Sequence, residues 1–235
     1  MENVATLKGK IIIVTGAAGN LGEAVTGKFL QNGATVIGTV LHTEPDLKGN
    51  STFRKVGVDL TDEAASSQFV ETMVAEYGEL HAAILTVGGF AAGNIAGTKT
   101  SDITKQYQLN FETAYNIARP VFLQMLKQNG GRIFLIGSKP GLDSRSGKGM
   151  IAYGLAKSLI FRLAELMNEE GKSHNVVTSV IVPGTIDTPQ NRKAMPDANF
   201  DNWVKPEAIA DVIYFYCSQQ ANILREPLIK VYGNS

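Results

Sequence analysis

The sequence has little cysteine, no excess of either charge and no long apolar run, and each absence excludes a class of protein. Cys217 is the single cysteine among 235 residues, so no internal disulfide can form and a reducing compartment is expected. Lys plus Arg and Asp plus Glu both total 22, which gives no electrostatic argument for a nucleic-acid or membrane partner. The apolar run at residues 11–14 is too short to span a bilayer, and no secretory leader is recognisable. We therefore expect a cytoplasmic protein.

No linker, charge run, low-complexity tract or long internal repeat divides the chain. Hydrophobic residues make up 44% and charged residues 19%, which is an ordinary globular balance. The length suits one large α/β domain or two small ones. A single domain over residues 1–235 is the simpler prediction.

Short apolar runs alternate with longer amphipathic stretches. Strands are predicted at residues 11–14, 35–40, 52–58, 82–87, 132–136, 176–182 and 227–232. Helices are predicted at residues 20–32, 61–77, 101–128 with a break near Asn110, 151–170 and 205–219. This alternation, with continuously apolar strands, predicts an α/β fold of the Rossmann type: a doubly wound parallel sheet of about seven strands with helices on both faces. Ligands in such folds bind at the carboxyl ends of the strands.

Three glycines follow the first strand with the spacing G-x-x-G-x-x-G: Gly16, Gly19 and Gly22. Such a turn lets backbone amides and a helix amino terminus approach a pyrophosphate, and Gly22 is expected to let the helix pack closely on the sheet. The alternative is a helix cap with incidental glycines, but the position after the first strand favours a dinucleotide. The expected cofactor contacts in this turn are Gly16, Ala18, Gly19, Asn20 and Leu21.

The choice between NAD and NADP stays open. Residues 39–41, at the end of the second strand, contain no acid to hold the ribose hydroxyls of NAD. His42 and Thr43 could face a 2′-phosphate, yet no arginine lies near them, and His42 could equally be a solvated loop residue. Asp59 could accept a hydrogen bond from the adenine amino group, or cap the helix at Thr61.

Tyr153 and Lys157 stand four residues apart at the start of a predicted helix, so their side chains share one face. A free phenol has a pKa of about 10, and a nearby ammonium is expected to favour the phenolate. In the reducing direction the phenol would give its proton to the substrate as hydride arrives. Alone, such a pair is usually an exposed helix face. Its position after a fifth strand that ends in Gly137 and Ser138, in a chain that also has the glycine turn, favours catalysis.

Together these residues resemble the short-chain dehydrogenase/reductase family over nearly the whole chain. The resemblance implies that Ser138 orients the substrate and that Asn110 bends a helix and holds a water in a proton relay. It also implies that Lys157 holds the nicotinamide ribose. Further cofactor contacts are implied at Val87, Gly88, Pro183, Gly184, Ile186 and Thr188. No metal is expected.

The sequence departs from the family pattern at three places. Asn20 replaces the middle glycine of the commonest fingerprint, although asparagine tolerates left-handed conformations. Thr86 stands where the family commonly has asparagine. The loop between Ser138 and Tyr153 is about two residues longer than usual, so Ser138 is either a substrate-orienting residue or a simple turn residue.

Several segments look most similar to the dihydropteridine reductase branch. These are the glycine spacing, the loop at residues 88–94, residues 149–157 and the run at residues 185–203. The resemblance implies reduction of a quinonoid dihydropterin, with Phe90, Asn191 and Trp203 as tentative substrate contacts. Phe90 and Trp203 could equally be core or lid residues. Residues 191–203 are predicted to form a lid.

Two other functions compete with this prediction. One is a general carbonyl or 3-oxoacyl reductase, and the other is a non-catalytic cofactor-binding sensor. The Tyr153 and Lys157 pair argues against a sensor, which needs no proton donor. The two long helices at residues 110–128 and 151–167 pair between subunits in the family, so the resemblance implies a homodimer or homotetramer.

Overall fold

Seven parallel strands form one sheet in the order β3-β2-β1-β4-β5-β6-β7. The structure is a computed structural model that describes residues 7–41 and 52–234. The strands are β1 (Ile11–Thr15), β2 (Thr35–Val40), β3 (Phe53–Gly57), β4 (Ala82–Leu85), β5 (Gly131–Ile136), β6 (Val176–Pro183) and β7 (Leu228–Val231). The chain adds strands on one side of β1 up to β3 and on the other side from β4 onward, which places a switch point between β1 and β4. The predicted α/β fold with about seven strands is confirmed.

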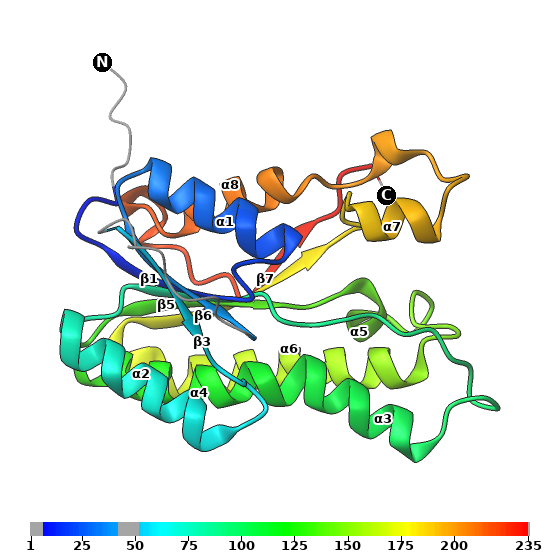
Figure 1. Cartoon of the computed structure of the whole chain (residues 1–235), viewed down its shortest axis with the longest axis horizontal. Coiled ribbons are helices and arrows are strands. Elements are labelled where there is room, and N and C mark those ends of the chain that lie inside the picture. The colour runs from blue at the N-terminus through cyan, green and yellow to red at the C-terminus, as the bar shows by residue number, and fades with distance from the viewer. Residues whose placement is uncertain (1–6, 42–51, 235) are drawn as a thin grey trace.

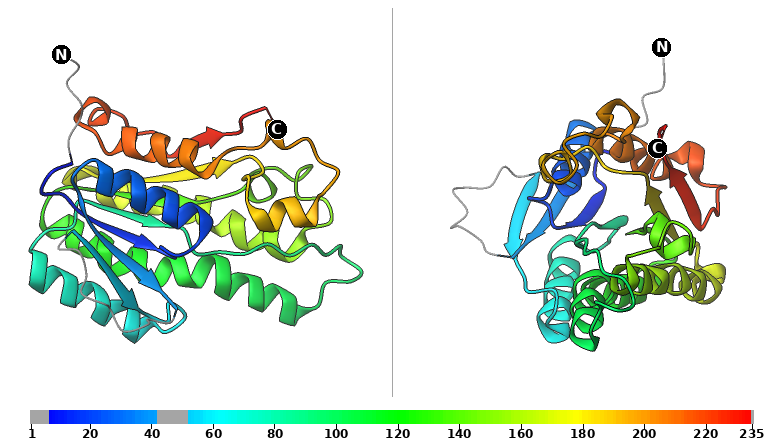
Figure 2. Two further views of the ribbon diagram at one scale, coloured as in Figure 1. Left: turned by 45° about the horizontal axis from the view of Figure 1, so that its top comes forward. Right: turned by 90° about the vertical axis from the view of Figure 1, so that its right-hand side faces the viewer.

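Helices cover both faces of the sheet (Figure 1). On one face lie α1 (Asn20–Gln31) and α8 (Pro206–Tyr216), and on the other lie α2 (Glu63–Tyr77), α4 (Thr113–Lys127) and α6 (Ile151–Gly171). The helix α3 (Thr100–Tyr107) leads into α4 through a π-helical turn, η1 (Gln108–Glu112). Two short helices, α5 (Lys139–Leu142) and α7 (Pro189–Ala194), lie at the carboxyl ends of the strands (Figure 2). The remaining short elements are the 3₁₀ turns η2 (Lys172–His174), η3 (Phe200–Asn202) and η4 (Gln219–Ala221).

The sheet is buried on both sides, as its apolar strands require. All eight residues of β6 are buried, and so are all four of β4. One core packs the sheet against α2, α4 and α6, and a second packs it against α1 and α8. Because all seven strands are parallel, their carboxyl ends lie at one end of the sheet, and the loops that follow them converge there.

The start of α2 differs from the sequence prediction. The helix begins at Glu63, because the Asp62 carboxylate accepts a hydrogen bond from the Ala65 amide at 3.0 Å and caps it. Asp59 instead accepts from the amide and the hydroxyl of Thr61, at 2.9 and 2.6 Å. These bonds with Thr61 hold the pKa of Asp59 below its usual value. Asp59 therefore organises the turn before α2 and is not the helix cap.

Among the described residues, no helix is both long enough and apolar enough to cross a membrane.

Candidate active site

The turn between β1 and α1 presents backbone amides to solvent. Gly16 has a φ of +64°, a value that favours glycine, and its carbonyl accepts from the Gly19 amide at 2.9 Å. Gly19 caps α1 without a side chain, so nothing from the cap accepts from the first helical amides, at Asn20 and Leu21. Ala18 is exposed beside them. An uncapped helix amino terminus next to a glycine turn suits the pyrophosphate of a dinucleotide, so these residues fit an NAD(P) cofactor.

Gly22 has a different packing role from the one predicted. A Cβ there would lie only 2.1 Å from the carbonyl oxygen of Gly16, so the close approach is between α1 and the glycine turn itself. The sheet is approached instead by Ala17, which lies in the turn between β1 and α1. A Cβ added to Gly38 in β2 would lie 2.5 Å from the Cβ of Ala17. Gly16 and Gly22, six residues apart, therefore allow the turn and α1 to pack together. Gly38 allows Ala17 of the turn to pack against the sheet.

Two threonines form hydrogen bonds that hold the turn in place, a role that the sequence pattern did not indicate. The Thr39 hydroxyl accepts from the Gly16 amide at 3.4 Å, and its carbonyl accepts from the Ala17 amide at 3.0 Å. The Thr86 hydroxyl donates to the Thr15 carbonyl at 2.6 Å. Their position, at or just past the ends of the strands that flank β1, was the signal that could have found them.

The second strand ends without a charged group among the residues described. Leu41 follows β2 and is 67% exposed. His42 and Thr43, which the sequence analysis considered for a 2′-phosphate, lie outside the described residues. The contact between Asp59 and adenine stays a prediction, with one carboxylate oxygen of Asp59 already bound to Thr61.

Tyr153 lies in the first turn of α6, where its hydroxyl shares a hydrogen bond with that of Ser138. Ser138 follows β5, and its hydroxyl also accepts from the Gly141 amide at 3.3 Å. The loop from residue 138 to residue 153 folds into α5 at its start, and so the expected extra length does not carry Ser138 away. Ser138 is therefore both the cap of a short helix and a partner of the phenol.

Lys157 is 4% exposed and lies one helical turn beyond Tyr153. Its ammonium donates to the Ile136 carbonyl at 2.8 Å and stands 6.0 Å from the centre of the Tyr153 ring. Gly88 also lies close to this ammonium. A Cβ on Gly88 would lie 3.3 Å from the Lys157 nitrogen and 2.7 Å from the Asn110 side-chain oxygen. The absence of a side chain at Gly88 therefore lets the ammonium and the amide share one small space.

The helix breaks at Asn110, as predicted, and the break is the π-helical turn η1. The Asn110 amide group forms two bonds with Gly89, accepting from its N–H at 3.0 Å and donating to its carbonyl at 2.9 Å. It also donates to the Gln106 side chain at 3.0 Å. π-helical turns occur often at functional sites because they redirect one side chain out of the regular ladder. Here the turn directs Asn110 to the loop that follows β4.

Burial is the largest influence on the pKa of the Tyr153 phenol. Burial raises the pKa of Tyr153, and the hydrogen bond with Ser138 opposes this rise. Burial also lowers the pKa of Lys157 to about 8. The expectation that Lys157 favours the phenolate stays a prediction; the ammonium donates to the Ile136 carbonyl, and burial is the larger influence on the phenol. The phenol is therefore held as a proton donor, which is the form that a reduction needs.

The segment after β6 is tied together by its own side chains. Pro183 ends the strand, and the Gly184 amide donates to Val231 at 2.8 Å. The Thr188 hydroxyl caps α7 by accepting from the Asn191 amide at 3.1 Å. The Asn191 side chain donates to the Ile186 carbonyl at 2.8 Å. These bonds place the predicted cofactor contacts Pro183, Gly184, Ile186 and Thr188 in one ordered stretch at the carboxyl edge. Their contacts with a cofactor stay predictions.

Residues 191–203 form most of α7, a turn and η3, and an unpredicted contact holds them. Arg192 binds the Asp187 carboxylate with two hydrogen bonds, at 2.6 and 2.8 Å, and lies over the Phe200 ring. Trp203 packs on Phe200 with ring centres 4.7 Å apart. Asn191 and Trp203 are thus engaged within the segment, and their substrate contacts are untested.

Phe90 is 62% exposed, so it is not a core residue. Its ring meets that of Tyr153 edge-on, with centres 5.2 Å apart. Of the three tentative substrate residues, Phe90 is the one that the structure places beside the phenol. Its ring is therefore an exposed aromatic surface next to the proton donor.

The glycine turn and the Tyr153 phenol lie at the same ends of the strands, which suits proton donation beside a bound dinucleotide. The short chain dehydrogenase family profile matches residues 10–199, and the chain belongs to this family. Its members typically use NAD(P). The 3-oxoacyl-(acyl-carrier-protein) reductase FabG of Thermotoga maritima is 26% identical to the chain and covers 97% of it over 98% of its own length. The uncharacterized oxidoreductase YvrD of Bacillus subtilis is 32% identical, over 76% of this chain and 69% of its own.

Solved structures show the same fold. A short-chain type dehydrogenase/reductase from Mycobacterium ulcerans has a TM-score of 0.87 at 22% identity, covering 97% of this chain and 90% of its own. A short-chain dehydrogenase/reductase from Serratia marcescens has a TM-score of 0.83 at 23% identity, covering 97% and 99%. The expected membership of the dihydropteridine reductase branch finds no support in these relatives.

Proposed function

We propose that this protein is an NAD(P)H-dependent carbonyl reductase that acts on 3-oxoacyl or related ketone substrates. The observation that carries the proposal is the arrangement of Tyr153 between Ser138 and Lys157, at the edge where the glycine turn is exposed. Relatives named 3-oxoacyl-(acyl-carrier-protein) reductase and cyclohexanol dehydrogenase support a carbonyl or alcohol substrate.

The chemistry follows from what each side chain can do. A bound NAD(P)H supplies the hydride for the carbonyl carbon. Tyr153 donates its phenolic proton to the carbonyl oxygen as that C–H bond forms, giving the alcohol. Ser138 orients the same oxygen through the hydroxyl that now bonds to the phenol. Lys157 holds a positive charge one helical turn away, which stabilises the phenolate left behind.

A substrate panel tests the proposal at the nicotinamide absorbance. The panel contains an acetoacetyl thioester, cyclohexanone and a quinonoid dihydropterin, each with NADH and with NADPH. We expect turnover on the ketones, and Tyr153→Phe should lower kcat by about 100-fold to 10,000-fold while leaving cofactor binding nearly intact. Cofactor binding without turnover on any substrate would instead indicate a sensor. Separate NADH and NADPH titrations identify the cofactor, which the uncharged end of β2 leaves undecided.

Reduction of a quinonoid dihydropterin is a second candidate because of one observation. The exposed Phe90 ring stands edge-on to Tyr153 and could line the pocket of a flat heterocycle. Phe90→Ala separates the candidates. It should raise KM for the pterin about tenfold or more and leave the ketones within about threefold, since a stacked or edge-on aromatic contact contributes about 1 kcal/mol beyond area. If Phe90→Ala changes KM equally for all substrates, Phe90 only positions Tyr153.

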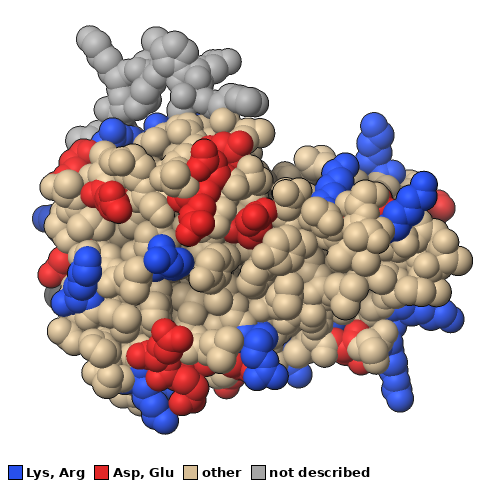
Figure 3. Space-filling view, turned by 90° about the horizontal axis from the view of Figure 1, so that it is seen from below, with Lys and Arg blue, Asp and Glu red and all other residues tan. Residues whose placement is uncertain are grey.

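A second copy of the chain is proposed as the partner, in the cytoplasm. Large apolar side chains are exposed on α4 and α6, among them Tyr115, Leu123, Leu155, Leu159 and Leu166. Figure 3 shows much uncharged surface on this helical face. Light scattering of the wild type should give a dimer or tetramer mass, and Leu159→Glu should lower that mass. A monomeric wild type would contradict this part of the proposal.

A further inference from the structure

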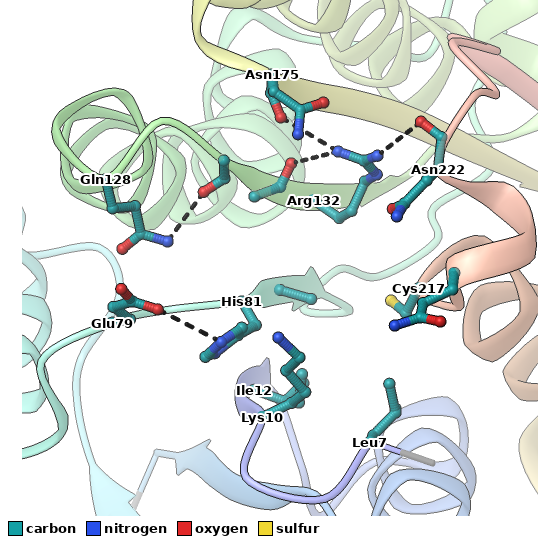
Figure 4. Close-up of a pocket in the computed structure, with 14 residues that line it drawn as sticks. Leu7, Lys10, Ile12, Glu79, His81, Gln128, Arg132, Asn175, Cys217 and Asn222 are labelled. Atoms are coloured by element: carbon teal, nitrogen blue, oxygen red, sulfur yellow. Dashed lines mark hydrogen bonds and ion pairs between the residues drawn. The ribbon is translucent and has the colours of Figure 1, made fainter. Parts of the chain in front are cut away.

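A cavity lies at the opposite end of the sheet from Tyr153, where the strands begin. It has a volume of about 310 Å³ and is bounded by the starts of β1, β4 and β5, the end of α4 and the turn after α8. Figure 4 shows Arg132 and Gln128 on one side of it and His81 and Lys10 on the other. The amides of Asn175, Asn222 and Gln219 add further polar lining, while Leu7, Ile12 and Ala82 contribute apolar surface.

Arg132 lines this cavity and is half-buried. Its guanidinium has no carboxylate partner among the described residues. Its two terminal nitrogens donate to the backbone carbonyls of Gly131, Asn175 and Asn222, at 3.1 to 3.4 Å. The Nε–H group has no acceptor in the described part of the chain. A cation withdrawn from water without a counter-charge carries a free-energy cost that an anion would relieve. Burial, and the neighbouring Arg225, lower the pKa of Arg132.

Arg192 shows what such a guanidinium edge binds in this protein. Its Nε and Nη2 atoms donate side by side to the two oxygens of Asp187. Arg54 and Arg162 also hold carboxylates, although they are more exposed than Arg132. Because Nε of Arg132 is free and faces no carboxylate, the matching ligand group is a planar or tetrahedral oxyanion.

Two further basic side chains, Lys10 and His81, line the same space. The Lys10 ammonium has no hydrogen bond or ion pair among the described residues, and Figure 4 shows its side chain reaching toward the cavity. The Nδ1 atom of His81 accepts from the Ile11 amide at 3.1 Å, so the neutral ring carries its hydrogen on Nε2. Glu79 is the single acid that lines the cavity. It lies at the exposed rim, 3.6 Å from that Nε2.

We propose that the cavity bounded by Lys10, His81 and Arg132 binds a small organic oxyanion, a carboxylate or a phosphate ester. Its volume exceeds that of a bare ion and matches the small end of ligand pockets. The apolar residues accommodate a short carbon frame, and the amides bind its polar groups. The ligand joins the starts of three strands to the end of α4 and the turn after α8, so its binding stabilises the fold.

The test uses the full chain saturated with the nicotinamide cofactor, which occupies the anion-binding glycine turn. Citrate and inorganic phosphate are titrated separately by calorimetry and by thermal unfolding, against chloride at matched ionic strength. We expect saturable binding of at least one probe. Lys10→Gln should weaken it about fivefold, as for a partly exposed charge, and Arg132→Gln about tenfold or more. Lys105→Gln, an exposed lysine on α3, is the matched control and should bind as the wild type does.

Three results would overturn the proposal. A thermal shift that rises linearly and equally in all variants is a general salt effect. If saturable binding appears only in a parallel titration without cofactor, it belongs to the glycine turn. Saturable binding that Lys10→Gln leaves unchanged lies elsewhere. If Arg132→Gln does not fold, Arg132→Lys keeps the charge without the Nε–H edge, and it too should weaken binding.

Discussion

The side-chain amide of Asn20 donates to the side-chain oxygen of Gln190 at 2.9 Å, and so joins the glycine turn to α7 across 170 residues of sequence. Asn20 is the residue that replaces a glycine of the commonest fingerprint. Its side chain thus gives the turn a direct link to the segment predicted to be a lid, at the place where a cofactor's pyrophosphate would lie.

Gln190→Ala should open this link. The bond is exposed and contributes about 1 kcal/mol or less, so global stability should barely change. Trypsin cleavage at Arg192 and Lys193 should become several-fold faster, because local opening then costs less. Bound cofactor should slow cleavage in both proteins. Gln31→Ala, an exposed change at the end of α1, serves as the control. Equal cleavage rates in Gln190→Ala and wild type would show that the bond does not restrain the lid.

Two glycines of one helix should respond in opposite ways to alanine. Gly22→Ala places a Cβ 2.1 Å from the Gly16 carbonyl oxygen, and should cost about 3 kcal/mol or more with loss of cofactor binding. Gly27→Ala meets nothing within 4 Å, and should raise the free energy of unfolding by up to about 1 kcal/mol. Urea unfolding of both variants measures this. A tolerated Gly22→Ala would contradict the close packing of α1 on the turn.

A similar pair tests the loop after β4. Gly88→Ala crowds Asn110 and Lys157, so kcat should fall by about tenfold or more while the protein stays folded. Gly89→Ala meets only the end of the Leu109 side chain, which can move. Its kcat should stay within about threefold of wild type. Steady-state kinetics with circular dichroism as the folding control distinguish them, and equal losses would remove the special role of Gly88.

Lys157→Met should abolish turnover and change how stability depends on pH. A folded pKa of about 8, against 10.5 for a free lysine, means that the folded state holds this proton less tightly. The resulting cost of about 3 kcal/mol is fully present below pH 8 and disappears as the pH rises toward 10.5. The stability of the variant relative to wild type should therefore fall by about 2 kcal/mol between pH 7 and pH 9.5.

Urea unfolding at both pH values measures that change, with Lys105→Met as an exposed control. A relative stability of Lys157→Met that does not depend on pH would show that burial does not perturb the lysine. Because the Ile136 carbonyl loses its donor in the variant, the difference between the two pH values is the informative quantity, and the absolute value at one pH is not.

Much of the fold was predictable because periodicity and glycine placement are local signals. The seven strands follow from apolar runs. Two of the long helices stop just before glycines, Gly33 and Gly78, both of which have positive φ. The start of α2 was misplaced because Asp59 and Asp62 both resemble caps, and only the folded turn distinguishes them. The predicted fourth strand ends early, at Leu85, and the Thr86 side chain just beyond it donates to the Thr15 carbonyl at the end of β1.

The chemical site was predictable in part for the same reason. Tyr153 and Lys157 are neighbours on one helix, so their spacing was enough to pair them. The direction of the Tyr153 pKa shift was not, because it depends on burial by segments far away in sequence. The same holds for the cavity at the opposite edge, where Lys10, Arg132 and Cys217 come from three distant elements.

The π-helical turn η1 makes α3, η1 and α4 one continuous rod that contains an extra residue at Asn110. Each residue of a regular helix advances the rod by about 100°. Removal of one residue from the turn would therefore restore a regular helix and rotate one half of the rod against the other by that angle. Asn110 would then face away from Gly89, or the apolar side of α4 would leave the sheet. The length of this turn is thus a more rigid requirement than the identity of most side chains within it.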